Sequence, residues 1–592
     1  MLLLTLALFV GAKAVFMLAN GAGHGVTAGD VLAVVCHGFS LDLATSLYFL
    51  AFPLLVSIAS LWVRVPRRVL TVYFAVVATA FALAFVADTS LYAFWGFKLD
   101  ASCLQYLSQP EGITQSVSLW YLLWRLVLLT AAAAGMFVLF RLTLRRWDTP
   151  PARLLTAKSK VRLTALHVAL MPLMVIGIRG GLSESTTNIG QVYFSANQFL
   201  NHSAVNPVFS FLYSMSHQTG DLAEYRFFSD AESIRLTSNV YTTRSLTADT
   251  LLTTRRPDVL VILLESAGEQ FAHAMPHLQQ LKREGVSFSR CYANSWRTDR
   301  GTVCTLSGYP SFPGLSVMKM PEKSRSLPSI ARTLKGEGYS TSYIYGGDIN
   351  FTNMRSYLIG TGWDRLVSMD DYSSEQRHTA QWGVRDDITF ATVYDLLTQS
   401  HATPLLIGYS TLSSHEPWDV PTKTVADEVD NAFTYVDDCL YSFVEKLKAT
   451  PQWQNLLIVI TADHGINHGD IDQSTPLLKN HIPLVWTGGA VRGGHSVGVI
   501  CNQSDLAATL LGQMGLPHDD FTFSRDVTSR SYTYPVAIHN YNNAQWAIDS
   551  TGHVLCDFDA HRLTINASRD ASRLERVSKA MLQRSCHDLL RR

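Results

Sequence analysis

Five long apolar runs occupy most of the first 180 residues of this chain. A helix that crosses a lipid bilayer needs about 20 mostly apolar residues. We predict membrane-spanning helices at 2–18, 43–63, 69–87, 119–140 and 163–178, so that residues 1–180 form an α-helical transmembrane domain with five helices. A cleaved signal peptide is the alternative for the first run, but no basic segment precedes it and further apolar runs follow.

The basic residues between these runs predict the side of the membrane on which each loop lies. The loop at 19–40 has no Lys or Arg and the loop at 88–118 has only Lys98, whereas the loops at 64–68 and 141–162 contain three and seven. Loops rich in positive charge stay in the cytoplasm, so the N-terminus is predicted to be cytoplasmic. Because five is an odd number of spans, everything after residue 178 is predicted to lie outside the cytoplasm.

Three charged residues in or beside the apolar runs leave two interpretations open. Asp42, Asp88 and Arg125 either line a groove that faces a substrate or lie near span ends and face the lipid headgroups.

The rest of the chain has the composition of an ordinary globular protein. With 592 residues the chain is too long for a single hydrophobic core. Lys plus Arg and Asp plus Glu balance at 48 each, which argues against a nucleic-acid partner, because such proteins usually carry a basic excess. We predict a juxtamembrane helical linker at 181–256, in which 206–216 is apolar enough to lie on a membrane surface, and an extracytoplasmic catalytic domain at 257–592.

Apolar runs and amphipathic segments alternate in the predicted catalytic domain. Strands are predicted at 258–266, 339–347, 403–415 and 455–465, and helices at 271–285 and 425–450. Strands that alternate with helices favour an α/β fold with a mostly parallel sheet flanked by helices.

Acidic and imidazole side chains stand where these strands end. Glu265 ends the first predicted strand, His415 the third, and Asp463 and His464 the fourth. Ligands of parallel sheets bind at the carboxyl ends of the strands. Carboxylate and imidazole groups gathered there predict one divalent metal site.

Five motifs in this order resemble one known family. The segments are DVLVILLES, RTDRGTVCTLSGYP, GGDINFTNMR, SSHEPW and TADHG. Together with the five preceding spans they resemble the lipoteichoic acid synthase and phosphoglycerol transferase branch of the alkaline phosphatase–sulfatase superfamily, in its Gram-negative form. The resemblance implies an alkaline phosphatase/sulfatase-like fold for residues 257–592.

The resemblance also implies a role for individual residues. Glu265, Asp463 and His464 match the ligands of one divalent metal, with Mn²⁺ favoured over Zn²⁺ and Mg²⁺, and Thr298 matches a nucleophilic threonine that also binds the metal. Further matches are substrate-binding residues, namely Arg355 on the phosphate, His415 near the reacting phosphoryl group, and His481 as a further ligand or phosphate contact. His415 is also a catalytic candidate, as a proton donor or acceptor.

Other nucleophiles in the second motif fit less well. Thr298 lies ten residues before Gly308, the spacing from nucleophile to glycine in the related sulfatases, whereas Thr302 and Thr305 lie further along the chain. Cys304 stands in CTLSG, where Leu and Gly replace the Pro and Arg of the sulfatase C-x-P-S-R motif. We therefore expect Cys304 to be a small core residue.

The implied activity is that of a phosphotransferase in cell-envelope biogenesis. The family transfers glycerol phosphate from phosphatidylglycerol to a surface or periplasmic glycan or glycerol-phosphate acceptor through a phosphothreonine intermediate. Such an enzyme is a multi-pass protein of the bacterial inner (cytoplasmic) membrane, surrounded by membrane lipids, with a periplasmic or extracellular catalytic domain. The alternatives are a phosphoethanolamine transferase acting on lipid A or a glycan, a sulfatase-like hydrolase or phosphodiesterase, and a metal-free scaffold.

Overall fold

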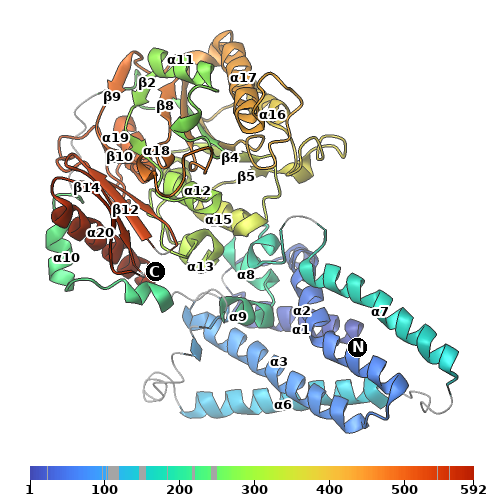
Figure 1. The fold of residues 1–592 in the computed structure, drawn as a ribbon. Coiled ribbons are helices and arrows are strands. Elements are labelled where there is room, and N and C mark those ends of the chain that lie inside the picture. The colour runs from blue at the N-terminus through green and yellow to red at the C-terminus, as the bar shows by residue number, and fades with distance from the viewer. Residues whose placement is uncertain are drawn as a thin grey trace. The chain divides into compact units, whose positions relative to one another are not determined.

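Two compact units make up the computed structural model of the chain (Figure 1). They are Met1–Gln218 and Thr219–Arg592. The structure describes residues 1–22, 24–95, 98–101, 103–104, 119–145, 155–182, 185–195, 197–215, 220–241, 250–542, 544–558 and 560–592. The segment predicted as a linker, 181–256, contributes helices to both units.

In the described part of the first unit, five helices are long and apolar enough to cross a membrane, as predicted. They are α1 (Leu2–Asn20), α2 (Ala28–Trp62), α3 (Arg67–Trp95), α6 (Leu119–Arg145) and α7 (Ala157–Arg179). The second helix begins much earlier than residue 43, so the predicted loop at 19–40 was too long. A capping box between Thr27 and Asp30 starts α2 at Ala28, because it satisfies the free N–H groups of the first turn.

The two shorter helices α8 (Gln198–Ala204) and α9 (Pro207–Met215) also belong to the first unit. Asn206, between these two helices, donates to Asp42 Oδ1 at 2.9 Å, and Lys13 Nζ forms a buried ion pair with Asp42 Oδ2 at 2.5 Å. Asp42 is only 1% exposed. Neither earlier interpretation of Asp42, a groove residue or a headgroup contact, describes this packing role.

The second unit is built on an eight-stranded sheet with the order β5-β4-β6-β1-β7-β8-β2-β9. All neighbouring strands are parallel except β8, which is antiparallel to both β7 and β2, so the prediction of a mostly parallel sheet is confirmed. The central strand β1 is buried along its whole length, as a strand covered on both faces must be. The strands are β1 (Asp258–Leu264), β2 (Val286–Phe288), β4 (Ser340–Tyr345), β5 (Arg365–Val367), β6 (Leu405–Ser410), β7 (Leu456–Ala462), β8 (Leu484–Thr487) and β9 (His495–Val497).

The helices of this unit follow the strands along the chain. The helix predicted at 271–285 begins only at Pro276, because a proline lacks the N–H that a helix interior needs. The helix predicted at 425–450 is α17, which Asp427 caps. The helices that accompany the sheet are α11 (Pro276–Glu284), α12 (Thr298–Ser307), α13 (Pro321–Ser324), α14 (Ile330–Gly336), α15 (Met354–Thr361), α16 (Asp386–Thr398), α17 (Glu428–Lys448), α18 (Pro476–Lys479) and α19 (Leu506–Met514).

A second, four-stranded antiparallel sheet ends the chain. Its order is β11-β12-β13-β14, the C-terminal helix α20 (Ala571–Arg591) packs on it, and α10 (Asp230–Leu236) packs on α20 (Figure 1). A short parallel pair, β3 (Cys291–Tyr292) and β10 (Cys501–Asn502), contacts strand β11 of this sheet. The four strands are β11 (Ala537–Asn540), β12 (Ala544–Asp549), β13 (Gly552–Asp557) and β14 (Arg562–Ser568).

Candidate active site

Four neighbouring parallel strands bring the predicted site residues to one edge of the sheet. The strands β4, β6, β1 and β7 are adjacent and point the same way. The segment after β4 leads to Arg355, the loop after β6 to His415, β1 to Glu265, and β7 to Asp463 and His464. This edge is where parallel sheets bind their ligands.

Hydrogen bonds between the loops fix the position of Glu265. Its backbone N–H donates to Thr411 Oγ1 at 2.9 Å, and Ser414 Oγ donates to its carbonyl at 2.7 Å. Ser266 Oγ donates to Glu265 Oε1 at 2.8 Å, although Ser266 itself has a φ of 59°. The residue that follows Glu265 therefore has a strained backbone conformation. Such strain is common at functional sites.

Three buried side chains at this edge fit a bound cation. Ligand atoms of Glu265, Asp463 and His464 all lie within 4.8 Å of one another. Asp463 Oδ1 accepts the N–H groups of Ser266 and His464, each at 2.8 Å, while its Oδ2 is buried without a hydrogen-bond partner among the described residues. Burial and the charge of Asp463 raise the pKa of Glu265. A divalent cation would offset the negative charges of Glu265 and Asp463 and bind to Asp463 Oδ2.

Thr298 is the first residue of α12 and faces these groups. Its Oγ1 lies 3.2 Å from Glu265 Oε2 and 3.4 Å from His464 Nε2. The first turn of α12 comes this close because Gly301 has no side chain: a Cβ there would lie 2.1 Å from the carbonyl oxygen of Asp463. The structure therefore brings Glu265, Asp463 and His464 together around the hydroxyl of Thr298.

The other nucleophiles of the motif are buried in the helix packing. Thr302 and Thr305 are fully buried, and Thr305 Oγ1 donates to the carbonyl of Gly301 at 3.0 Å. Cys304 is also buried, which raises the pKa of its thiol, so the prediction of a core cysteine is confirmed.

The ring of His415 has a defined proton arrangement. Its Nδ1 lies 2.8 Å from the carbonyl oxygen of Glu416. Because a carbonyl can only accept, Nδ1 carries a proton, and Nε2 is left to exchange a proton with another group.

Trp382, which the sequence analysis did not single out, holds this loop. Its Nε1–H donates to the same Glu416 carbonyl at 2.5 Å, and its ring centre lies 4.6 Å from that of His415. The turn that carries Trp382 bridges at Gly383 to Gly347, in the loop after β4. Trp382 thus connects the loops that lead to His415 and Arg355; a tryptophan–glycine pair in a polar segment was its only signal in the sequence.

Asp386 is a second residue that the sequence analysis missed. It accepts the N–H groups of Leu412 and Ser413 at 2.9 Å and the hydroxyl of Tyr409 at 3.0 Å. Burial raises its pKa to about 6. These bonds order the segment between β6 and His415.

Arg355 lies in the first turn of α15, and its guanidinium donates a hydrogen bond from Nε. Nε donates to Asn350 Oδ1 at 2.8 Å, and burial lowers the pKa of the group. Within the described part of the chain, no carboxylate lies within ion-pair distance of Arg355. Arg355 is half-buried, and Asp370, Asp348 and Asp371 act on its charge from beyond ion-pair distance, so its guanidinium is still able to bind an anionic ligand.

His481 is placed differently from the other predicted residues. Its Nε2 lies 3.0 Å from the carbonyl of Ser289, and its ring centre lies 5.3 Å from that of Tyr292. Only its backbone approaches the loop after β1, where its carbonyl accepts the N–H of Glu269 at 2.8 Å. The structure does not bring the His481 ring together with Glu265, Asp463 and His464.

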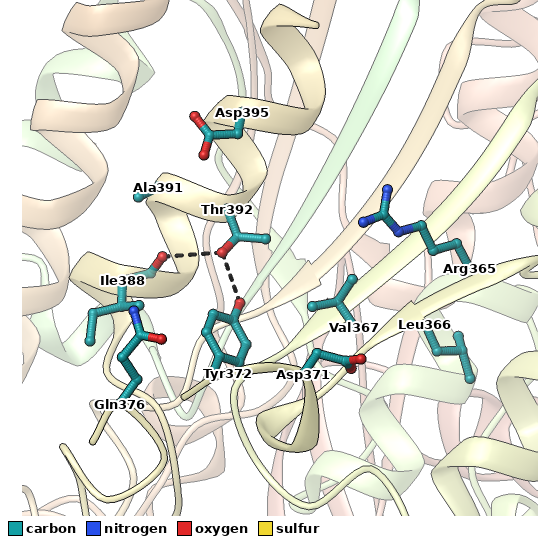
Figure 2. A pocket seen from close by; sticks show the side chains of 10 residues that line it. All are labelled: Arg365, Leu366, Val367, Asp371, Tyr372, Gln376, Ile388, Ala391, Thr392 and Asp395. Atoms are coloured by element: carbon teal, nitrogen blue, oxygen red, sulfur yellow. Dashed lines mark hydrogen bonds between the residues drawn. The ribbon is translucent and has the colours of Figure 1, made fainter. Parts of the chain in front are cut away.

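A pocket at the edge of the main sheet is separate from this site. Figure 2 shows it between β5 and α16, where Tyr372 donates to Thr392 Oγ1 at 3.0 Å. None of its lining residues is among the predicted site residues.

Comparison with known proteins agrees with the fold and with the predicted resemblance. The Sulfatase family model matches residues 257–516. Lipoteichoic acid synthase 2 of Bacillus subtilis is 26% identical over 258 residues, which are 39% of this chain and 39% of that protein. Phosphoglycerol transferase I of Escherichia coli is 22% identical over 268 residues, 42% of this chain and 35% of its own.

Solved structures share the fold of the second unit. A protein of the alkaline phosphatase superfamily from Vibrio parahaemolyticus has a TM-score of 0.54 at 23% identity and covers 62% of this chain and 97% of its own. A lipoteichoic acid synthase from Listeria monocytogenes has a TM-score of 0.52 at 15% identity and covers 61% of this chain and 98% of its own. The predicted alkaline phosphatase/sulfatase-like fold is thus confirmed. The chain spans well under half the length of the two curated relatives.

Proposed function

We propose that this protein is a membrane-bound phosphoglycerol transferase, which moves glycerol phosphate from phosphatidylglycerol to an acceptor through a phosphothreonine at Thr298. The observation that carries the proposal is the Thr298 hydroxyl, 3.2 Å from Glu265 and 3.4 Å from His464 at the start of a helix. The names of the two curated relatives support this reaction over hydrolysis.

Glu265, Asp463, His464 and Thr298 would hold one divalent cation, for which we propose Mn²⁺. When bound, such a cation lowers the pKa of a coordinated hydroxyl and offsets charge on phosphate oxygens. The N–H groups in the first turn of α12 point toward the same place and favour an anion. Arg355 is proposed to bind two phosphate oxygens with its guanidinium.

In the first step, the Thr298 hydroxyl loses its proton to solvent, Oγ1 bonds to phosphorus, and the bond from phosphorus to the diacylglycerol oxygen breaks. We assign to His415 the proton that this oxygen takes up, delivered from Nε2. In the second step, an acceptor hydroxyl attacks phosphorus, its proton passes to Nε2, the bond to Thr298 Oγ1 breaks, and Oγ1 regains a proton from solvent. Nδ1 keeps its proton and donates it in a hydrogen bond to the Glu416 carbonyl throughout, which leaves Nε2 as the exchanging atom.

We further propose that the five spans lie in the bacterial inner membrane, with the N-terminus in the cytoplasm and the catalytic domain outside. This places Thr298 on the side where phosphatidylglycerol headgroups of the outer leaflet and glycan acceptors are present. His481, whose ring lies away from the acidic group, is proposed to act only through its backbone contact with the loop after β1.

The test is a product assay with the purified full chain in detergent and Mn²⁺. Phosphatidylglycerol labelled in its headgroup should release diacylglycerol and transfer label to glycerol as a soluble acceptor, and Arg355→Lys should reduce the rate at least tenfold because the paired contact is lost. Phosphatidylethanolamine should give neither product. Release of diacylglycerol from phosphatidylethanolamine alone would assign the enzyme to phosphoethanolamine transfer instead.

A further inference from the structure

Two cysteines lie opposite each other in the short parallel pair of β3 and β10. Cys291 begins β3, Cys501 begins β10, and the two residues are partners in the register of the pair. The backbone N–H of Cys501 donates to the carbonyl of Arg290 at 3.1 Å, which fixes this register. Among the described residues, no other two cysteines are partners on neighbouring strands.

The spacing of the two strands fits a covalent bond between these side chains. Neighbouring strands lie about 4.8 Å apart, and the Cα atoms of a disulfide are usually about 4.4–6.8 Å apart. Both residues are thiols in this structure. The pKa of the Cys291 thiol is raised well above its ordinary value, first because it forms a hydrogen bond with Cys501 and then because it is buried. The two sulfur atoms therefore lie beside each other.

The surroundings of this pair do not suit a reactive thiol or a metal ligand. Cys291 is 0% exposed and Cys501 is 1% exposed, whereas catalytic cysteines are partly exposed and have a lowered pKa. In the part of the chain that the structure describes, neither cysteine belongs to a group of side chains able to hold a metal ion. A bond between the two sulfur atoms is the chemistry that remains open to them.

The pair lies between two segments that build the candidate active site. After β3 the chain runs directly to α12, whose first residue is Thr298. After β10 it runs to Gln503, whose Nε2 donates to the carbonyl of Asp463 at 2.9 Å. A bond between Cys291 and Cys501 would thus join the segment that leads to Thr298 and the segment that supports Asp463.

We propose that Cys291 and Cys501 form a disulfide bond, which closes the long loop that contains β4, β6 and β7. The proposal rests on one part of the proposed function, the location of the catalytic domain outside the cytoplasm, where disulfides form and persist. The two thiols give up two protons and two electrons as the S–S bond forms, and the disulfide of a thiol oxidase is reduced to two thiols by exchange. This exchange precedes the pairing of β3 with β10, because the folded chain buries both sulfur atoms.

Peptide mapping of the full chain tests the bond. Cells that produce the wild type are lysed in acid, free thiols are blocked with N-ethylmaleimide under denaturing conditions, and the chain is digested without reductant and analysed by mass spectrometry. We expect a linked pair of peptides that contain Cys291 and Cys501 and that separate after reduction. N-ethylmaleimide on both cysteines, or a link from either one to a different cysteine, would overturn the proposal.

A reporter fused after residue 218 in the same cells separates failure of this proposal from failure of the proposed function. Unlinked cysteines in a domain that the reporter places outside the cytoplasm would overturn the disulfide alone. Unlinked cysteines in a domain that the reporter places inside would overturn both the orientation and the disulfide. Linked peptides in a protein that releases no diacylglycerol from phosphatidylglycerol would contradict the proposed reaction and leave the disulfide in place.

The thermal stability of the full chain in detergent gives a second readout. Incubation with a phosphine reductant should lower the Tm of the wild type by about 5 °C or more, because a cross-link across a long loop is lost. The variant Cys291→Ala/Cys501→Ala should show no effect of reductant. Cys586→Ala, at a buried cysteine of α20, is the matched control and should stay sensitive to reductant. An equal fall in Tm in the double variant would overturn the proposal. The peptide map needs no variant, so it decides the question even if the double variant does not fold.

Discussion

The carboxyl group of Glu265 links the stability of the fold to the metal. It is buried beside Asp463, and both effects raise its pKa above the ordinary value of about 4.5. A carboxyl with a raised pKa binds more protons in the folded than in the unfolded state over the range between the two values. Stability of the metal-free protein must therefore fall as the pH rises through that range.

We predict that this pH dependence is removed by Glu265→Gln. Without metal, the free energy of unfolding of the wild type should fall by up to about 1.4 kcal/mol per pH unit above pH 4.5 until the raised pKa is passed, since one proton is involved. The variant should lack this slope. Urea unfolding of the full chain in chelator at several pH values measures it, with Mn²⁺-loaded wild type as the control. Equal slopes in wild type and variant would contradict the electrostatic role of Glu265.

Trp382 is expected to act as a positioning residue for His415. Trp382→Phe keeps a ring near the imidazole but removes the N–H that binds the Glu416 carbonyl. A hydrogen bond contributes about 1 kcal/mol, so kcat for diacylglycerol release should fall about fivefold with little change in KM.

Two variants give this prediction its controls. Trp382→Leu also removes the ring contact and should lose more activity, while Trp453→Phe, at a half-buried tryptophan outside the site, should match the wild type. A rise in KM without a fall in kcat for Trp382→Phe would show that Trp382 contacts substrate rather than positioning His415.

The site residues differ in how visible they are in a sequence. Glu265, Asp463 and His464 stand at the ends of apolar runs, and the topology of a parallel sheet brings such ends together. Trp382 gives no such signal, because it reaches the site through a turn that bridges Gly383 to Gly347.

Among the elements, α12 has the tightest packing requirement. Its first turn rests on the backbone of Asp463 at Gly301, where a Cβ would lie 2.1 Å from a carbonyl oxygen. Gly301→Ala must displace Thr298 or Asp463, and overpacking of this kind costs about 1–3 kcal/mol. We predict a lower Tm and at least a tenfold loss of activity, measured by calorimetry and turnover. Gly336→Ala, in a helix with nothing within 4 Å of the new methyl group, is the control and should not lower the Tm.

The main sheet was more predictable than the first unit or the C-terminal sheet. The strands β1 and β7 are buried along their whole length, so they read as continuous apolar runs. The helix α2 was shortened in the prediction because its first turns contain polar residues, and its start depends on the local cap at Thr27. The exposed edge strand β14 alternates in burial and carries few apolar residues, which hides it among loop sequences.

For the whole molecule, the odd number of spans decides where the catalytic domain lies. A reporter alkaline phosphatase, which is active only outside the cytoplasm, should be active when fused after residue 218 and inactive when fused after residue 145, because the basic loop follows the fourth span. Activity at residue 145, or none at residue 218 in a stably expressed fusion, would reverse the proposed orientation.

The phosphothreonine is the most direct test of the proposed chemistry. Wild type and Thr298→Ala would each be incubated with phosphatidylglycerol and Mn²⁺ without an acceptor, and the peptides would be analysed by mass spectrometry. We predict a phosphoglycerol adduct on Thr298 of the wild type and no adduct in the variant. Release of diacylglycerol by the wild type with no adduct on the peptide that contains Thr298 would contradict the account, because the phosphoryl group would then pass directly to water or the acceptor.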